Sequence, residues 1–244
     1  MAEEGKLSPI LPKNRELEYR FQTYSQIVSP RRSTSPRLVY PLYHLKSQGF
    51  WEPRDINVNP AEGYDDIENV SINPSFYEQL QSLFFRYKAR EILITRYFIE
   101  DEYPSLMGLV NESYRKSFQH DFGLIEENEK FKQAQKAKFA IQVLSAYNFT
   151  CALTGEKEDI EATHIQPFTD DQYYIPQNGL ALCSKAKHLF EKGAWSLTDE
   201  FRVIVNSNWD DSYKYAGKPI KVPQDDDYFP NKVFLNWHRN NLMR

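Results

Sequence analysis

The stretch "IEATHIQPFTDDQYYIPQNGLALCSKAKHLFEKG", residues 160–193, places two histidines and an asparagine in a short, turn-rich segment. "IEATHI" is partly β-branched and predicts a strand that ends near His164, and "NGLALCS" predicts a second strand opened by Asn178 and Gly179. "KAKHLFEKG" has the spacing of a helix with a glycine stop. Strand, loop, strand and helix would bring His164, Asn178 and His188 around one small cleft.

Such a cleft has a simple chemical use. Hydrolysis of a phosphodiester needs a water that is activated near neutral pH and a cation on the phosphate oxygens, and a neutral imidazole with a divalent metal supplies both. The alternative is structural, because three buried polar residues can be satisfied by backbone hydrogen bonds alone.

Four segments, "CALTG", "EATHIQPF", "NGLALC" and "KHLFEKGAWSL", follow one another in this order between residues 139 and 206. Together they resemble the HNH endonuclease family, which has a ββα-metal finger. The resemblance implies that His164 is the general base, that Asn178 fixes the loop and orients that base, and that His188 is a metal ligand on the helix. It also implies that an activated water attacks the phosphate and leaves 5′-phosphate and 3′-hydroxyl ends.

The second metal ligand departs from the best-known family pattern. Thr163 stands where that pattern has an Asp, Glu or His immediately before the base. Glu161 and Asp170 are the candidate ligands, with Gln166 as another loop candidate, although Glu161 needs a bulge or twist to reach the face that bears His164. An ion with so few protein ligands keeps several waters, which predicts Mg²⁺, with Mn²⁺ as a substitute.

The two cysteines, Cys151 and Cys183, cannot form a disulfide framework or a four-thiolate zinc site. We predict that both are reduced core residues. In some relatives of the HNH family these positions hold half of a structural zinc site, but the other thiolates are missing here, so no structural zinc is expected.

The flanking segments predict a nuclease domain over residues 126–244. "EENEKFKQAQKAKFAIQVLSAYNF" becomes apolar toward its end and predicts a long bridging helix. "WSLTDEFRVIVNS" predicts a β-hairpin, and "NKVFLNWHRNNLMR" predicts a terminal helix that docks by its apolar side chains. The expected fold class is α+β, with a mixed N-terminal recognition domain over residues 1–125.

Within residues 1–125, "SPRRSTSPR" predicts an exposed basic loop and "LVYPLYHLKSQGFWE" predicts a strand or hairpin. "NPSFYEQLQSLFF" and "RYKAREILITRYF" predict one or two helices through residue 99, beginning at an asparagine cap followed by proline.

The segment "RLVYPLYHLKSQGFWE", the helical region after it and the terminal "LNWHR" resemble restriction endonucleases with a C-terminal HNH domain. Some of these recognise modified DNA, including phosphorothioate DNA through a sulfur-binding domain. Cations would fix phosphates while aromatic and proline surfaces accept a polarisable group. The candidate DNA-binding residues are Arg31, Arg32, Arg37, Tyr40, Pro41, Tyr43, His44 and Lys46. The alternative is that the aromatic residues are core and the arginines belong to a solvated loop.

Charge and hydropathy indicate where the protein is located more clearly than they indicate its binding partner. The net charge is −4, but the acidic residues gather in patches, so other faces stay basic. No run approaches the roughly 18–20 apolar residues of a membrane span, and the start of the chain lacks the pattern of a signal peptide. We therefore expect a cytoplasmic protein with DNA as its partner and no membrane partner.

Three functions stay open on the sequence alone. The first is a metal-dependent DNA endonuclease of a restriction or phage-defence system. The second is a catalytically inactive DNA-binding or regulatory protein that keeps the finger as a fold. The third is an RNA-directed nuclease. One finger per chain favours a homodimer, or two successive encounters, for cutting both strands of a duplex.

Overall fold

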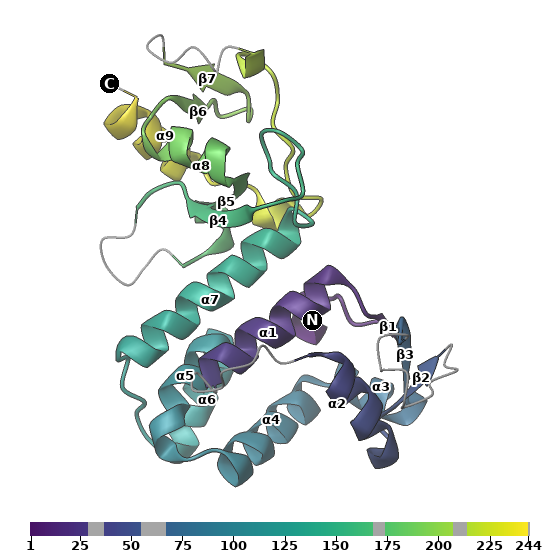
Figure 1. The fold of residues 1–244 in the computed structure, drawn as a ribbon. Coiled ribbons are helices and arrows are strands. Elements are labelled where there is room, and N and C mark those ends of the chain that lie inside the picture. Colours follow the sequence, from purple (N-terminus) through teal and green to yellow (C-terminus); the bar gives the residue numbers. More distant parts are fainter. Residues whose placement is uncertain (29–36, 55–66, 168–173, 207–213, 244) are drawn as a thin grey trace. The chain divides into compact units, whose positions relative to one another are not determined.

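Helices make up most of the protein, and its strands form small antiparallel sheets (Figure 1). The computed structural model describes residues 1–28, 37–54, 67–167, 174–206 and 214–243. It divides into two units, Met1–Ala134 and Gln135–Arg244, and the division falls inside helix α7 (Glu129–Ala146). The α+β fold class is therefore confirmed.

The first unit combines helices with one three-stranded sheet. Its elements are β1 (Ile10–Pro12), α1 (Arg15–Val28), α2 (Val39–His44), β2 (Trp51–Arg54), β3 (Asn69–Ile72), α3 (Pro74–Gln81), α4 (Leu83–Tyr97), α5 (Tyr103–Leu109) and α6 (Glu112–Phe122), with 3-10 turns η1 (Ala2–Glu4), η2 (Leu45–Gln48) and η3 (Glu100–Glu102). The sheet order is β1-β3-β2, and both pairs are antiparallel. Burial alternates along β3, so Val70 and Ile72 face the core.

Two apolar clusters and one buried cation hold this unit. The first cluster consists of Leu38, Val39, Leu42, Ile67 and Val70, and the second of Ile94, Met107, Tyr114, Phe118 and Phe131. Arg20 is buried on α1, where its guanidinium donates to Glu4 (3.0 Å) and Glu16 (2.8 Å). Because a buried charge is costly without partners, both carboxylates stabilise the guanidinium, and the bond to Glu4 fixes the N-terminal segment against α1.

The predicted helices around residues 73–99 are confirmed as two helices, α3 and α4. The Asn73 side chain accepts from the backbone N–H of Ser75 (3.0 Å) and Phe76 (3.3 Å), and Pro74 takes the first helical position. Ser82 ends α3 and caps α4 through the Phe85 N–H (3.3 Å).

The predicted strand over "LVYPLYHLKSQGFWE" is wrong for most of its length. Residues 39–48 form α2 and η2, and only Trp51 to Arg54 is a strand, which pairs antiparallel with β3. Leu38, Val39 and Leu42 are buried, a spacing that suits one face of a helix. The Trp51 indole N–H donates to the Leu42 carbonyl (2.9 Å) and so secures the helix end. The predicted loop "SPRRSTSPR" lies mostly outside the described residues.

The second unit contains the elements that the sequence predicts. They are β4 (Ile160–His164), β5 (Gly179–Cys183), α8 (Ser184–Glu191), β6 (Trp195–Leu197), β7 (Val203–Val205) and α9 (Lys232–Leu242), with 3-10 turns η4 (Pro176–Asn178) and η6 (Asp226–Tyr228). The strand pair β4-β5, the helix α8, the hairpin β6-β7, the long helix α7 and the terminal helix α9 are all confirmed.

The two faces of the β4-β5 pair are covered by different helices. In the register His164 lies opposite Gly179 and Thr163 opposite Leu180. A Cβ on Gly179 would lie 2.3 Å from the Val143 side chain, so α7 packs closely over the face that bears His164. Since side chains alternate along a strand, Glu161 and Thr163 point to the opposite face, where α8 contacts β4.

The terminal helix α9 docks through Phe234 and Leu235, as predicted, and also through a histidine that the sequence did not single out. His238 is fully buried, with Nδ1 2.9 Å from the Ser196 hydroxyl and Nε2 3.1 Å from the Phe190 carbonyl oxygen. Burial lowers its pKa to about 4, so the ring is neutral and both of its nitrogens have hydrogen-bond partners.

Cys151 and Cys183 are free thiols, and both are buried, which agrees with their prediction as core residues. None of the helices among the described residues is long and apolar enough to cross a membrane.

Candidate functional site

His164 ends β4 and packs against aromatic side chains. Its ring stacks on Phe139 of α7 with centroids 4.0 Å apart and planes 6° apart, and Tyr174 meets it edge-on at 5.8 Å. Its Nε2 is buried and has no hydrogen-bond partner among the described residues. Burial, assisted by the positive charge of Lys136, lowers the pKa of His164 to about 4. The imidazole is therefore neutral at pH 7 and has a lone pair with which to accept a proton.

Asn178 pins the chain immediately beyond this histidine. It is fully buried, and its side chain bonds both backbone groups of Gln166, accepting from the N–H (2.9 Å) and donating to the C=O (3.0 Å). Its own carbonyl accepts from the Ile165 N–H (2.9 Å). His164 and Asn178 are thus brought together, and these bonds fix the direction of the chain as it leaves β4.

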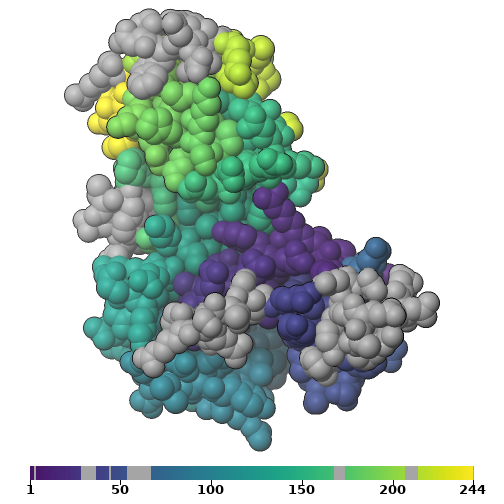
Figure 2. Space-filling view, in the orientation of Figure 1, coloured from purple at the N-terminus to yellow at the C-terminus, as the bar shows by residue number. Residues whose placement is uncertain are grey.

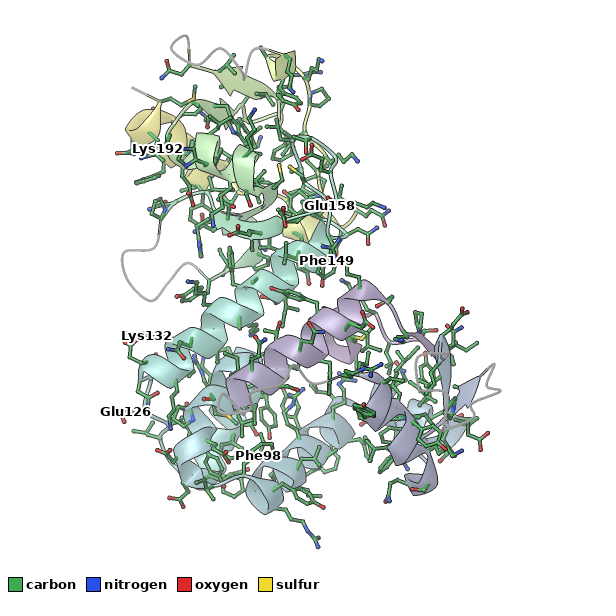
Figure 3. All side chains as sticks on the ribbon, in the orientation of Figure 1. Phe98, Glu126, Lys132, Phe149, Glu158 and Lys192 are labelled. Atoms are coloured by element: carbon green, nitrogen blue, oxygen red, sulfur yellow. The ribbon has the colours of Figure 1, made fainter. Side chains whose placement is uncertain are left out.

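The opposite face of β4 carries a charged pair with α8. The Lys187 ammonium lies 2.6 Å from one Glu161 carboxylate oxygen, and the Ser184 hydroxyl is 3.5 Å from the other. His188 is the next residue along α8 and is exposed. Lys192, labelled in Figure 3 just past α8, donates its backbone N–H to the His188 carbonyl (3.2 Å). In Figure 2 the green atoms of the segment around α8 lie on the visible surface.

The described residues do not assemble a metal site around His188. Glu161 is held by Lys187, and Thr163 is 2% exposed, with a hydroxyl that has no partner among the described residues. Asp170 lies outside the described residues. Within the described ranges, the groups of three or more His, Cys, Asp or Glu side chains close enough to share an ion comprise Asp225, Asp226 and Asp227, which are all exposed. Neither His188 nor Glu161 therefore belongs to a group of three or more such donors among the described residues.

The predicted DNA-binding residues lie on and beside α2 where they are described. The Arg37 guanidinium lies over the Tyr40 ring at 5.5 Å, and the Lys46 ammonium lies over the Tyr43 ring at 5.0 Å. Tyr40 is exposed, whereas Tyr43 also packs against the first core cluster, and Pro41 is half-buried. Arg31 and Arg32 lie outside the described residues, as does the side chain of His44.

Sequence reasoning missed two residues of the site. Phe139 belongs to the apolar end of the bridging helix α7, and its stack on His164 depends on the packing of α7 over β4. Lys187 stands beside His188, and both lie one turn beyond Ser184, so the helical period alone does not say which of them contacts Glu161. The helical period is the signal that the sequence offers, but it does not give the rotation of α8 about its own axis.

Parts of this chain are similar to known proteins. A family model described as "HNH endonuclease" matches residues 151–198, which span β4, β5, α8 and β6. No curated protein matches the chain. A solved structure described as "Modification dependent TagI restriction endonuclease" is similar to this chain at 20% sequence identity and a TM-score of 0.38, over 44% of this chain and 38% of that one. The family match places an HNH endonuclease domain, a nuclease module, at residues 151–198.

Proposed function

We propose that this protein is a metal-dependent endonuclease that hydrolyses DNA phosphodiester bonds in a restriction or phage-defence system. Residues 1–125 would recognise the DNA, including modified DNA, and residues 126–244 would cut it. The observation that carries the proposal is a neutral His164 at the end of β4, followed by a chain segment that Asn178 pins through two backbone hydrogen bonds.

His164 is proposed to act as the general base. Its lone pair takes a proton from water, the water oxygen attacks phosphorus, the bond from phosphorus to O3′ breaks, and the departing O3′ takes up a proton from solvent water. The products carry 5′-phosphate and 3′-hydroxyl ends. At pH 7 a ring with a pKa of about 4 is unprotonated and can accept a proton, but it is a weak base. A bound phosphate would raise that pKa, because negative charge favours the imidazolium form.

Asn178 is proposed as the positioning residue. The orientation of His164 depends on the first two residues after β4, and the Asn178 side chain and carbonyl hold both of them. Loss of these bonds would free the segment that sets the distance from the imidazole to the attacking water. Reaction rates are sensitive to such misplacement, because a shift of about 1 Å can cost on the order of 100-fold.

HNH endonucleases generally use a divalent metal. Mg²⁺, with Mn²⁺ as its substitute, stays our prediction, as do His188, Glu161 and Asp170 as its ligands. The described donors do not gather into such a site, so no step above is assigned to an ion. The prediction is checked by cleavage in EDTA and by restoration with each metal.

The recognition surface is proposed around α2. Two cations lie over tyrosine rings there, and Tyr40 is exposed. Such a surface offers positive charge to phosphates and flat rings to bases. A homodimer is proposed because a duplex has two strands to cut and each chain has one finger, and analytical ultracentrifugation with and without DNA tests it.

The first experiment compares wild type with His164→Ala on unmodified, cytosine-modified and phosphorothioated plasmids, in Mg²⁺, Mn²⁺ or EDTA. We expect wild type to cut in Mg²⁺ and the variant to lose cutting while it keeps most of its DNA binding. The preferred plasmid would identify the modification. Equal cutting by both proteins would refute His164 as the base.

A second candidate function is that of a DNA-binding or regulatory protein with a catalytically inactive finger. The engaged Glu161 and the Thr163 beside His164 favour it, because they leave few free metal donors. It predicts DNA binding without cutting in any divalent metal. An RNA-directed nuclease would instead cut RNA in a side-by-side assay with DNA.

A further inference from the structure

We propose that Lys187 is the phosphate-binding cation on the α8 side of the finger, so that contact with the DNA backbone at this face needs no metal ion. This inference rests on the proposed function, since it names the group that meets the phosphate.

The first step concerns which residue of α8 faces β4. Lys187 reaches across to Glu161 at 2.6 Å, whereas His188 is exposed. Neighbouring residues on an α-helix differ by about 100° in direction. Among the described residues of α8, Lys187 and Ser184 are the side chains that contact Glu161.

The second step concerns the carboxylate itself. The Lys187 ammonium occupies one Glu161 oxygen, and the Ser184 hydroxyl lies near the other. A metal ion at Glu161 would have to displace this ammonium, because two cations at one carboxylate repel each other. The positive charge on this face is thus already supplied by the chain.

The third step is that Lys187 has capacity left for a phosphate. An ammonium has three donors, and the contact with Glu161 engages one of them. The side chains of Lys187 and Glu161 are 28% and 51% exposed, and a pair this exposed contributes little stability. Glu161 therefore positions the Lys187 ammonium through a weak ion pair. The ammonium can bond phosphate oxygens beside Glu161 or leave Glu161 for them.

The test measures binding of a duplex DNA of about 30 base pairs by the full chain in EDTA, across a series of KCl concentrations. All proteins carry His164→Ala, so that no DNA is cut. Loss of one phosphate contact lowers the slope of log K against log salt by roughly 0.9. We expect Lys187→Gln to show that decrease and to weaken binding several-fold, and we expect Lys187→Arg to keep most of the binding.

The matched control is Lys185→Gln, which removes the same charge from the same helix. Lys185 lines a cavity of about 190 Å³ together with Leu189, Trp195 and Tyr215. We expect this variant to keep the wild-type slope. Circular dichroism and thermal melts verify that every variant is folded.

The decisive comparison uses Glu161→Gln and the double variant with Lys187→Gln. If Lys187 binds phosphate, Glu161→Gln alone binds DNA more tightly and the double variant stays as weak as Lys187→Gln. If Lys187 serves only to neutralise Glu161, the double variant returns to the parent affinity and the inference is overturned. Absence of DNA binding by every protein, including the parent, would instead refute the proposed function.

Discussion

Replacing Asn178 with alanine tests the pinned segment beyond His164. The change removes two side-chain hydrogen bonds and leaves the N–H and C=O of Gln166 without these partners. An unsatisfied buried polar group costs roughly 1–3 kcal/mol, so two of them set a limit of about 6 kcal/mol. Because Gln166 is half-buried and water can reach it in part, we expect the free energy of unfolding to fall by about 2–4 kcal/mol.

The assay is urea unfolding at pH 7.5, followed by tryptophan fluorescence and circular dichroism. Asn231→Ala is the matched control, because this exposed asparagine caps α9 with one hydrogen bond to the Val233 N–H (2.9 Å). A lost cap costs about 1 kcal/mol. If Asn178→Ala costs no more than the control, the two bonds to Gln166 do not hold the loop and the positioning argument fails.

The same variant separates positioning from folding. In buffer without urea, at a temperature where the variant is still folded, we expect the single-turnover cleavage rate to drop by at least roughly 10-fold, since the distance from His164 to its water is no longer fixed. DNA affinity should stay within about twofold, because Asn178 is fully buried and contacts no phosphate. An unchanged cleavage rate in a destabilised variant would make Asn178 a purely structural residue.

Three further predictions follow from the packing of the second unit. The folded pKa of His238 is about 4 against an ordinary 6.5, so the unfolded chain binds more protons in that window, and the His238 contribution to the free energy of unfolding should fall by about 2 kcal/mol from pH 7.5 to pH 5, in addition to the fall that the lowered pKa of His164 causes. Urea titration measures the total, and a flat profile would contradict the buried neutral ring of His238. Gly179→Ala should destabilise the unit by about 1–3 kcal/mol because its Cβ would overlap Val143, and adding Val143→Ala should restore part of the loss in thermal melts. Phe139→Ala should raise the pKa of His164 toward 6.5 by letting in water, which an NMR titration of the ring protons measures; no upward shift would refute burial as the cause.

The order of elements in the second unit could be predicted because its signals are local. β-branched and apolar runs predicted β4 and β5, and a helical period with a glycine stop predicted α8. The failure at residues 39–48 has a physical cause. Apolar and polar residues alternate in part over so short a segment, which favours a strand, whereas Leu38, Val39 and Leu42 have the spacing of one helix face and pack against residues of β2 and β3.

The sequence by itself determined which chemical groups are available: His164 at a strand end, Asn178 before the next strand, and Lys187 and His188 side by side on one helix. These follow from residue identity and local period. Only the tertiary structure decided which of them meet. Packing of α7 buried His164 against Phe139 and lowered its pKa, and the rotation of α8 about its axis turned Lys187 toward Glu161 and His188 toward solvent. Neither outcome is local, because each depends on contacts between segments that lie more than 20 residues apart in the chain.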